Sequence, residues 1–239
     1  MDIRSYKRRL KGRNGLKIVD LSHELVPSFL DDKAKLSSVD MRSVFCYFFK
    51  PDPEPEWHIA HLFSTSTHCG THLEAPYHWT KEGKDVASVP LESLIGPAVK
   101  LDFSQKKAGE SITLDEIKES CKGKLKKGDM VFLQTGHGKL WGTDKYWLDS
   151  PSLSVPAAEW LVDRGVKLVG IDAPRLDRFS GKGRERYVIH EVLHGNNVLV
   201  IENLANLEEL KKRGTAFVLP MKVRGLDAFP ARVVVVEEA

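Results

Sequence analysis

The chain has few cysteines, little net charge and no long apolar run. Its three cysteines, Cys46, Cys69 and Cys121, are too few and too far apart for a disulfide framework, so we expect a reducing, cytoplasmic setting. The formal net charge is only +3, with acids and bases mixed along most of the chain, and nothing demands nucleic acid or a membrane as a partner. No run is apolar enough to cross a bilayer, and no internal repeat occurs. These absences leave an ordinary globular protein.

Basic side chains crowd the first fourteen residues, at Arg4, Lys7, Arg8, Arg9, Lys11 and Arg13. No apolar stretch follows them that could form the core of a signal peptide. We interpret residues 1–14 as a solvated or subunit-docking basic extension, which is commoner than the alternative of a nucleic-acid-binding arm. Residues 15–239 then form one folded domain, long enough to bury a sizeable core.

The remaining chain alternates between apolar strand patterns and shorter helix signals. Apolar runs predict strands at residues 16–23, 98–103, 130–135, 167–172 and 198–201. The aromatic run at residues 44–49 suits a strand or the apolar wall of a pocket. Helices are predicted at 91–95, from a capping box between Thr113 and Glu116, and from a cap at Ser154 to Gly165. This succession predicts mixed α and β structure, although it is too irregular for a doubly wound sheet.

Three imidazoles and a carboxylate, those of His68, His72, His78 and Glu74, fall on even offsets within eleven residues. Even offsets place side chains on one side of an extended chain. A straight strand would separate His68 from His72 by roughly 13 Å, too far for one shared ion, so the chain must bend between them. Gly70 permits that bend. Because imidazole and carboxylate suit zinc, manganese or iron(II), the segment predicts a divalent-metal site.

A second cluster spans residues 190–204. Residues 190–194 match the H-E-x-x-H pattern of zinc proteases. That pattern needs a sustained helix, whereas a Gly-Asn-Asn run follows it at once. We favour a pairing of His190 with Glu202, because a carboxylate that ends an apolar strand needs a cation or a strong hydrogen-bond partner to offset its desolvation.

Together these segments resemble one family. Residues 68–78 are similar to the H-x-G-T-H-x-D-x-P-x-H signature of the cyclase family of metal-dependent hydrolases, which includes bacterial kynurenine formamidase (arylformamidase) and isatin hydrolase. Further similar segments follow in the same order along nearly the whole folded chain, at residues 19–22, 89–92, 96–97, 134–136, 170–174 and 190–204.

Two positions depart from the family pattern. Glu74 stands where the signature has Asp, and its extra methylene leaves the identity, the number and the bridging of the metal ions open. Residues 27–55, which help to shape the substrate pocket in relatives, carry no sequence that matches.

The resemblance implies a mixed α+β fold of the swivelling β/β/α kind, a single domain with a mixed central sheet, and a homodimer or homotetramer. By the same resemblance, one or two zinc or manganese ions are held by His68, His72, Glu74, His190 and Glu202. His78 would transfer protons to and from the substrate, and Glu202 would share that role. Glu191 and His194 are not ligands in the family pattern.

We therefore expect an arylformamidase-like hydrolase of an amide C–N bond, acting on a small formamide or cyclic amide. A divalent ion lowers the pKa of a bound water from about 16 towards about 7, so that hydroxide attacks the carbonyl near neutral pH. His78 accepts the proton of that water and hands it to the departing nitrogen.

Two alternatives stay open. The first is a zinc peptidase that uses His190 and His194, which we expect to lose metal in a His194→Ala variant. The second is a non-catalytic metal-binding relative, which would keep its metal and turn over no amide.

Overall fold

The computed structural model describes residues 15–27, 43–49, 60–123, 125–178, 187–211 and 213–238. The predicted basic extension, residues 1–14, lies outside them. None of the helices in these ranges is both long and apolar enough to pass through a bilayer.

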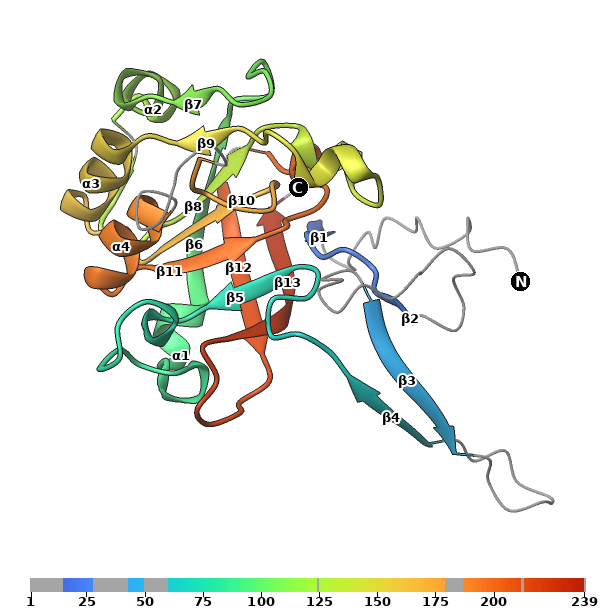
Figure 1. The fold of residues 1–239 in the computed structure, drawn as a ribbon. Coiled ribbons are helices and arrows are strands. Elements are labelled where there is room, and N and C mark those ends of the chain that lie inside the picture. The colour runs from blue at the N-terminus through green and yellow to red at the C-terminus, as the bar shows by residue number, and fades with distance from the viewer. Residues whose placement is uncertain are drawn as a thin grey trace.

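The main sheet closes into a barrel. Its strands are β1 (Leu16–Asp20), β5 (His72–Glu74), β6 (Ile95–Asp102), β8 (Met130–Gln134), β10 (Leu168–Ile171), β11 (Leu199–Glu202), β12 (Arg213–Pro220) and β13 (Ala228–Glu238). They follow the order β1-β13-β12-β6-β8-β10-β11-β5. Strand β13 also pairs with β5, so seven strands form a closed ring while β1 lies outside it against β13 (Figure 1).

Strand direction is mixed, as the sequence predicts. Four strands lie side by side in the order β6-β8-β10-β11 and run parallel to one another. The other pairings in the ring are antiparallel. Parallel strands need both faces covered, and every residue of β8, β10 and β11 is buried.

Side-chain alternation along the parallel strands divides the core in two. Met130 and Phe132 of β8 belong to a cluster with residues from around the barrel. Val131 and Leu133, which point to the opposite face, belong to a cluster that contains Leu161 and other helix residues. One core therefore fills the barrel and the other lies between the sheet and its helices.

The helices are α1 (Leu91–Leu94), α2 (Leu114–Cys121), α3 (Val155–Asp163) and α4 (Val188–Gly195). Figure 1 shows α2, α3 and α4 together on one side of the barrel. Two small sheets complete the described structure: β2 (Val26–Pro27), β3 (Ser43–Phe49) and β4 (Ala60–Ser64) form one, and β7 (Ser111–Ile112) and β9 (Ser152–Leu153) form the other.

Local signals predict several helix ends correctly. The capping box of Thr113 and Glu116 is present at α2. Gly165 has a φ of +70° just beyond α3. Ser154 is the N-cap of α3, but its side chain makes no capping hydrogen bond, which corrects the reason given for that helix start. The helix predicted at 91–95 ends one residue earlier, at Leu94, because Ile95 already begins β6.

Candidate metal centre

The two chemical segments of the sequence meet through strand β5. In the antiparallel ladder, His72 pairs with Glu202, and Glu74 pairs with Val200. Just before β5 the chain turns at Gly70, whose φ is +60°. The predicted bend between the first two histidines is therefore confirmed, and it brings residues near 70 and near 200 together.

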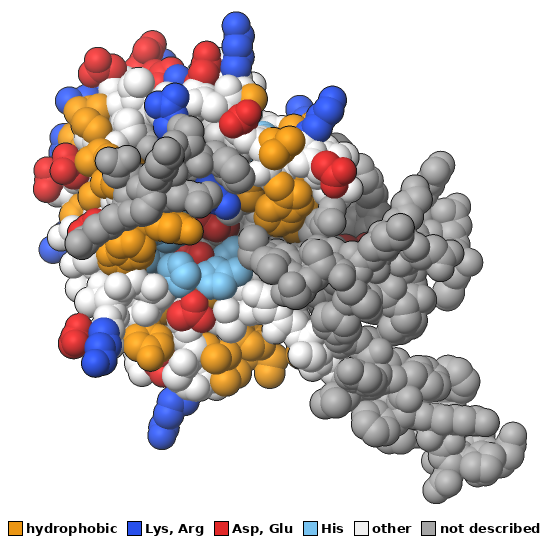
Figure 2. Space-filling model, viewed as in Figure 1, with side chains coloured by type: hydrophobic (Ala, Val, Ile, Leu, Met, Phe, Trp, Pro, Cys, Tyr) orange, Lys and Arg blue, Asp and Glu red, His pale blue; other side chains and the backbone are white. Residues whose placement is uncertain are grey.

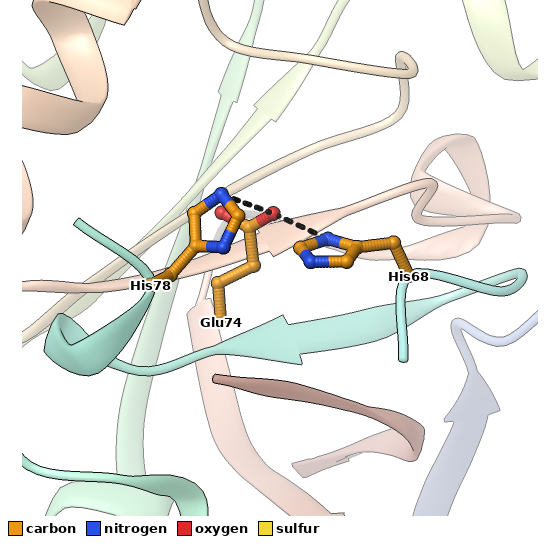
Figure 3. Close-up of side chains that lie close together, drawn as sticks. All are labelled: His68, Glu74 and His78. Carbon is orange, nitrogen blue, oxygen red and sulfur yellow. Dashed lines mark ion pairs between the residues drawn. The ribbon is translucent and has the colours of Figure 1, made fainter. Parts of the chain in front are cut away.

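Glu74 lies at the centre of the site with its side chain almost fully buried. On the Oε1 side, His68 Nδ1 lies 2.9 Å away and His72 Nε2 lies 3.3 Å away. His78 Nε2 is more distant, at 4.0 Å from the same oxygen. Figure 3 shows His68 and His78 on opposite sides of the carboxylate. Three imidazoles thus present a nitrogen to one oxygen.

The other carboxylate oxygen faces helix α4. His190 Nε2 lies 2.9 Å from Glu74 Oε2, and His194 Nε2 lies 3.6 Å from it. Glu202 Oε1 is 3.5 Å from His190 Nε2, and Glu202 Oε2 is 3.9 Å from His72 Nε2. His190 lies inside α4, and His194, one helical turn further on, also points into the site.

In His72 and His194, the ring nitrogen that faces away from Glu74 is hydrogen-bonded to the backbone. His72 Nδ1 lies 2.9 Å from the carbonyl oxygen of Gly70, and His194 Nδ1 lies 3.1 Å from that of Val198. A carbonyl oxygen only accepts, so each Nδ1 carries the hydrogen and each neutral ring has its Nε2 lone pair free. This tautomer and this kind of support are typical of metal-ligating histidines.

Two carboxylates outside the predicted set hold other rings. Asp177 hydrogen-bonds His190 Nδ1 and accepts the backbone N–H of Ile189 at 2.8 Å. Asp227 Oδ2 lies 2.9 Å from His68 Nε2 and 2.8 Å from His78 Nδ1. Both orient imidazoles that face Glu74, so they belong to the site although they do not touch its centre.

Charge compensation dominates the electrostatics. Burial would raise the pKa of Glu74, but attraction to the His190 imidazole and its hydrogen bond hold that pKa well below the usual range. Burial would lower the pKa of His190, but Glu74 and the hydrogen bond with Asp177 raise it well above the usual range. Burial would likewise lower the pKa of His68, but Asp227 and Glu74 raise it to about 10.

Donor type and spacing fit a divalent cation. Three sets have ligand atoms within 4.8 Å of one another: His68, Glu74 and His78; Glu74, His190 and His194; and His72, Glu74 and Glu202. Glu74 is common to all three. Nitrogen and carboxylate donors of this kind suit zinc, manganese or iron(II).

One edge of the cluster is open to solvent. The side chains of His68, His78 and Asp227 are 20%, 26% and 32% exposed, whereas that of Glu74 is 2% exposed. Figure 2 shows histidine surface at this point, beside acidic side chains and bordered by apolar ones. Among the described residues, the side of the cluster that bears His78 is therefore the exposed one.

The structure brings together all six side chains predicted from the sequence: His68, His72, Glu74, His78, His190 and Glu202. Asp177 and Asp227 were missed because no fixed spacing links them to the histidines that they hold. His194 is the second histidine of the H-E-x-x-H match, but it is not a ligand in the family pattern, so it was not predicted as a site residue. Cys69, which lies within the first cluster, is fully buried.

A closed mixed barrel with a buried carboxylate ringed by five imidazoles defines a protein of the metal-dependent enzyme class. A family model described as "Putative cyclase" matches residues 19–178. The chain belongs to this family, as its sequence pattern predicts.

Relatives agree in sequence and in fold. The chain is 29% identical over 171 residues to kynurenine formamidase of Bacillus thuringiensis (strain Al Hakam), covering 71% of this chain and 76% of the relative. It is 30% identical over 172 residues to an uncharacterised protein of Methanocaldococcus jannaschii, covering 71% and 78%. Isatin hydrolase A from Labrenzia aggregata, solved with benzyl benzoate, superposes with a TM-score of 0.82 at 26% identity, covering 94% and 95% of the two chains. The predicted fold class is thereby confirmed.

Proposed function

We propose that this protein is a metal-dependent hydrolase of an amide C–N bond in a formamide or a cyclic amide. The observation that carries the proposal is the convergence of five imidazoles on one buried carboxylate at a solvent-accessible edge. Two relatives that are named kynurenine formamidase and isatin hydrolase support this reaction class.

The cation would be zinc or manganese, in one or two copies. On the Oε1 side, we assign His68, His72 and Glu74 as its ligands, and on the Oε2 side we assign Glu74, His190 and Glu202. A divalent ion there supplies a Lewis acid, which makes water nucleophilic near neutral pH and stabilises negative charge on the attacked carbonyl oxygen.

His78 is the proton-transfer group in this proposal. Its ring is partly exposed, and Asp227 holds its Nδ1 at 2.8 Å. That hydrogen bond leaves Nε2 free to take a proton from the attacking water and return it to the departing nitrogen. The Asp227 carboxylate also stabilises the imidazolium that forms. Glu202 is the second candidate for proton transfer, on the buried side.

The aromatic residues beside the open edge favour an aromatic amide as substrate. The rings of Trp79 and Tyr187 lie 5.9 Å apart, and the Tyr187 ring lies 6.3 Å from that of His190. Aromatic side chains pack well against a flat aromatic group in offset or edge-on arrangements. We therefore place the aryl group of the substrate near these two residues.

The test is hydrolysis of N-formylkynurenine and isatin by protein that has been stripped with a chelator and then reloaded with zinc or manganese. We expect activity to disappear on stripping and to return on reloading. In a His78→Gln variant we expect wild-type metal content with kcat lower by ~10²–10⁴-fold. Undiminished hydrolysis by the stripped protein would overturn the proposal, and full metal content without any turnover would favour a non-catalytic relative.

Peptide hydrolysis is the second candidate, because His190 and His194 lie on one helix and both face Glu74. That chemistry needs Glu191 as the base on a sustained helix, whereas α4 ends at Gly195. We expect Glu191→Gln to leave amide hydrolysis intact, whereas a peptidase would lose its activity.

We also propose a homodimer or homotetramer in a reducing cytoplasm. The family resemblance supports the oligomer, and the small number and wide spacing of the three cysteines support the reducing setting. Light scattering on the purified full chain tests the subunit number.

A further inference from the structure

His194 has no role in the arrangement proposed so far, yet it is buried inside it, with 1% of its surface exposed. Its Nδ1 is committed to the carbonyl oxygen of Val198 at 3.1 Å. Its Nε2 is also buried and has no hydrogen-bond partner among the described residues. A buried polar atom of this kind costs free energy unless something satisfies it.

The atom that faces this nitrogen is Glu74 Oε2, at 3.6 Å. That distance is too long for a hydrogen bond. With the hydrogen on Nδ1, the lone pair of Nε2 points at a carboxylate oxygen that also only accepts. A cation between the two atoms turns this unfavourable pairing into a favourable one. Two donors that share a tetrahedral zinc lie roughly 3.4 Å apart, since each bond is about 2.1 Å long.

Sequence spacing explains why His194 is available. Residues four apart on a helix share one face, so α4 directs both His190 and His194 towards Glu74. The rings of these two histidines lie 5.6 Å apart. His72 provides an internal comparison: its Nδ1 is likewise held by a backbone carbonyl, and its Nε2 likewise faces Glu74. His137 shows the opposite case, because its Nε2 bonds the carbonyl oxygen of Tyr146 at 2.8 Å, away from the cluster.

We propose that His194 Nε2 is a metal ligand on the Oε2 side of Glu74, where it joins His190 in a buried set of donor atoms within 4.8 Å of one another. This inference rests on the proposed function. The donors on the Oε2 side, Glu74, His190 and His194, are all buried, whereas the Oε1 side includes His68, whose side chain is 20% exposed. The chain therefore holds one ion for structure and charge, and a second, at the solvent-accessible edge, for the reaction.

The test is equilibrium dialysis of the full-length protein against zinc, with bound metal measured by mass spectrometry. We expect two equivalents in the wild type and a loss of one equivalent, or at least a ~10-fold weaker second site, in His194→Phe and His194→Gln. Phe keeps the ring volume and Gln keeps a polar group, so a shared loss of metal reports the missing nitrogen. Glu191→Gln on the same helix is the matched control and should keep two equivalents.

The outcomes separate this inference from the proposed function. If both His194 variants keep two equivalents at wild-type affinity, the His194 assignment is wrong while the proposed function stands. If the wild type binds no divalent metal, the proposed function fails first. If neither variant folds, crystals of the wild type grown with zinc decide: an ion bonded to His194 Nε2 upholds the assignment, and an ion more than about 3 Å from it overturns the assignment.

Discussion

At the scale of single residues, Glu74 joins the two halves of the site because its two oxygens face different groups of histidines. Oε1 faces His68 and His72, and Oε2 faces His190. The family signature has the shorter Asp at this position, so the extra methylene changes how far the carboxylate reaches. Its burial also explains why so many imidazoles surround it, since a buried carboxylate needs compensating positive charge.

Asp177 supplies the first residue-scale prediction. It hydrogen-bonds His190 Nδ1 and so orients the ring with Nε2 towards Glu74. Asp177→Asn keeps the shape and an acceptor for the N–H of Ile189 but removes the charge. We expect metal affinity to fall by ~10–100-fold, as measured by competition with a chelating dye. Asp163→Asn, on the exposed end of α3, is the control, and equal affinities in the two variants would contradict the role of Asp177.

The raised pKa values of His68 and His190 predict proton release on metal binding. His68 is protonated at pH 7.5 in the metal-free protein, because its pKa of about 10 lies above that pH, and the pKa of His190 is raised in the same direction. An imidazole must lose its extra proton before it binds a metal, so metal binding releases protons. We therefore expect metal affinity to rise with pH until the pH reaches the pKa of His68, about 10. Calorimetric titration in buffers of different ionisation enthalpy measures the number released. Identical heats in all buffers, with no pH dependence of affinity, would contradict this expectation.

Residue-level sequence reasoning found the side chains with a repeated spacing and missed those without one. His68, His72 and Glu74 follow from even offsets around Gly70. Asp227 lies 149 positions from His78, which it holds, and only the folded chain brings these two together. One sequence taken alone gives no indication of a contact between residues so far apart.

At the scale of elements, the turn at Gly70 decides whether the first cluster can converge. Its φ of +60° is costly for any residue with a Cβ, and an added methyl group would overlap the side chain of Leu25. The strand that follows, β5, has only three residues, so an error in the turn moves His72 and Glu74 directly.

Gly70→Ala should therefore reduce both stability and metal binding. We expect a loss of about 1–2 kcal/mol in the free energy of unfolding from the left-handed backbone, together with weaker zinc binding. Gly109→Ala is the matched control, because Gly109 has a similar φ of +75° with nothing within 4 Å of an added Cβ. Urea denaturation and zinc titration of both variants make the comparison. Equal zinc affinities would show that the turn does not position the ligands.

The sequence predicted helices and strands correctly where short-range interactions determine them. The apolar runs that became β8, β10 and β11 and the capping box of α2 follow from periodicity and short-range hydrogen bonds. The sequence did not predict that residues 96 and 97 extend β6, because Gly and Pro usually break a strand. Pairing with β12 overrides that local preference.

At the scale of the whole molecule, barrel closure brings the site together. Strand β5 lies between β11 and β13, so closing the ring places residues 68–78 beside residues 190–202 and beside Asp227. Strand periodicity predicts neither the closure nor its register, because both depend on contacts between segments more than a hundred residues apart. The family resemblance predicted the fold class through similarity to known proteins rather than through local physics.

Metal content of two variants, His72→Ala and His190→Ala, tests the central claim most directly, because these residues come from the two distant segments that share Glu74. Mass spectrometry should show less zinc or manganese per chain in each variant than in the wild type, and hydrolysis of the amide substrates should fall with it. Circular dichroism confirms that each variant is folded. Full metal content in both folded variants would contradict the account, because the two segments would then not meet around a shared cation.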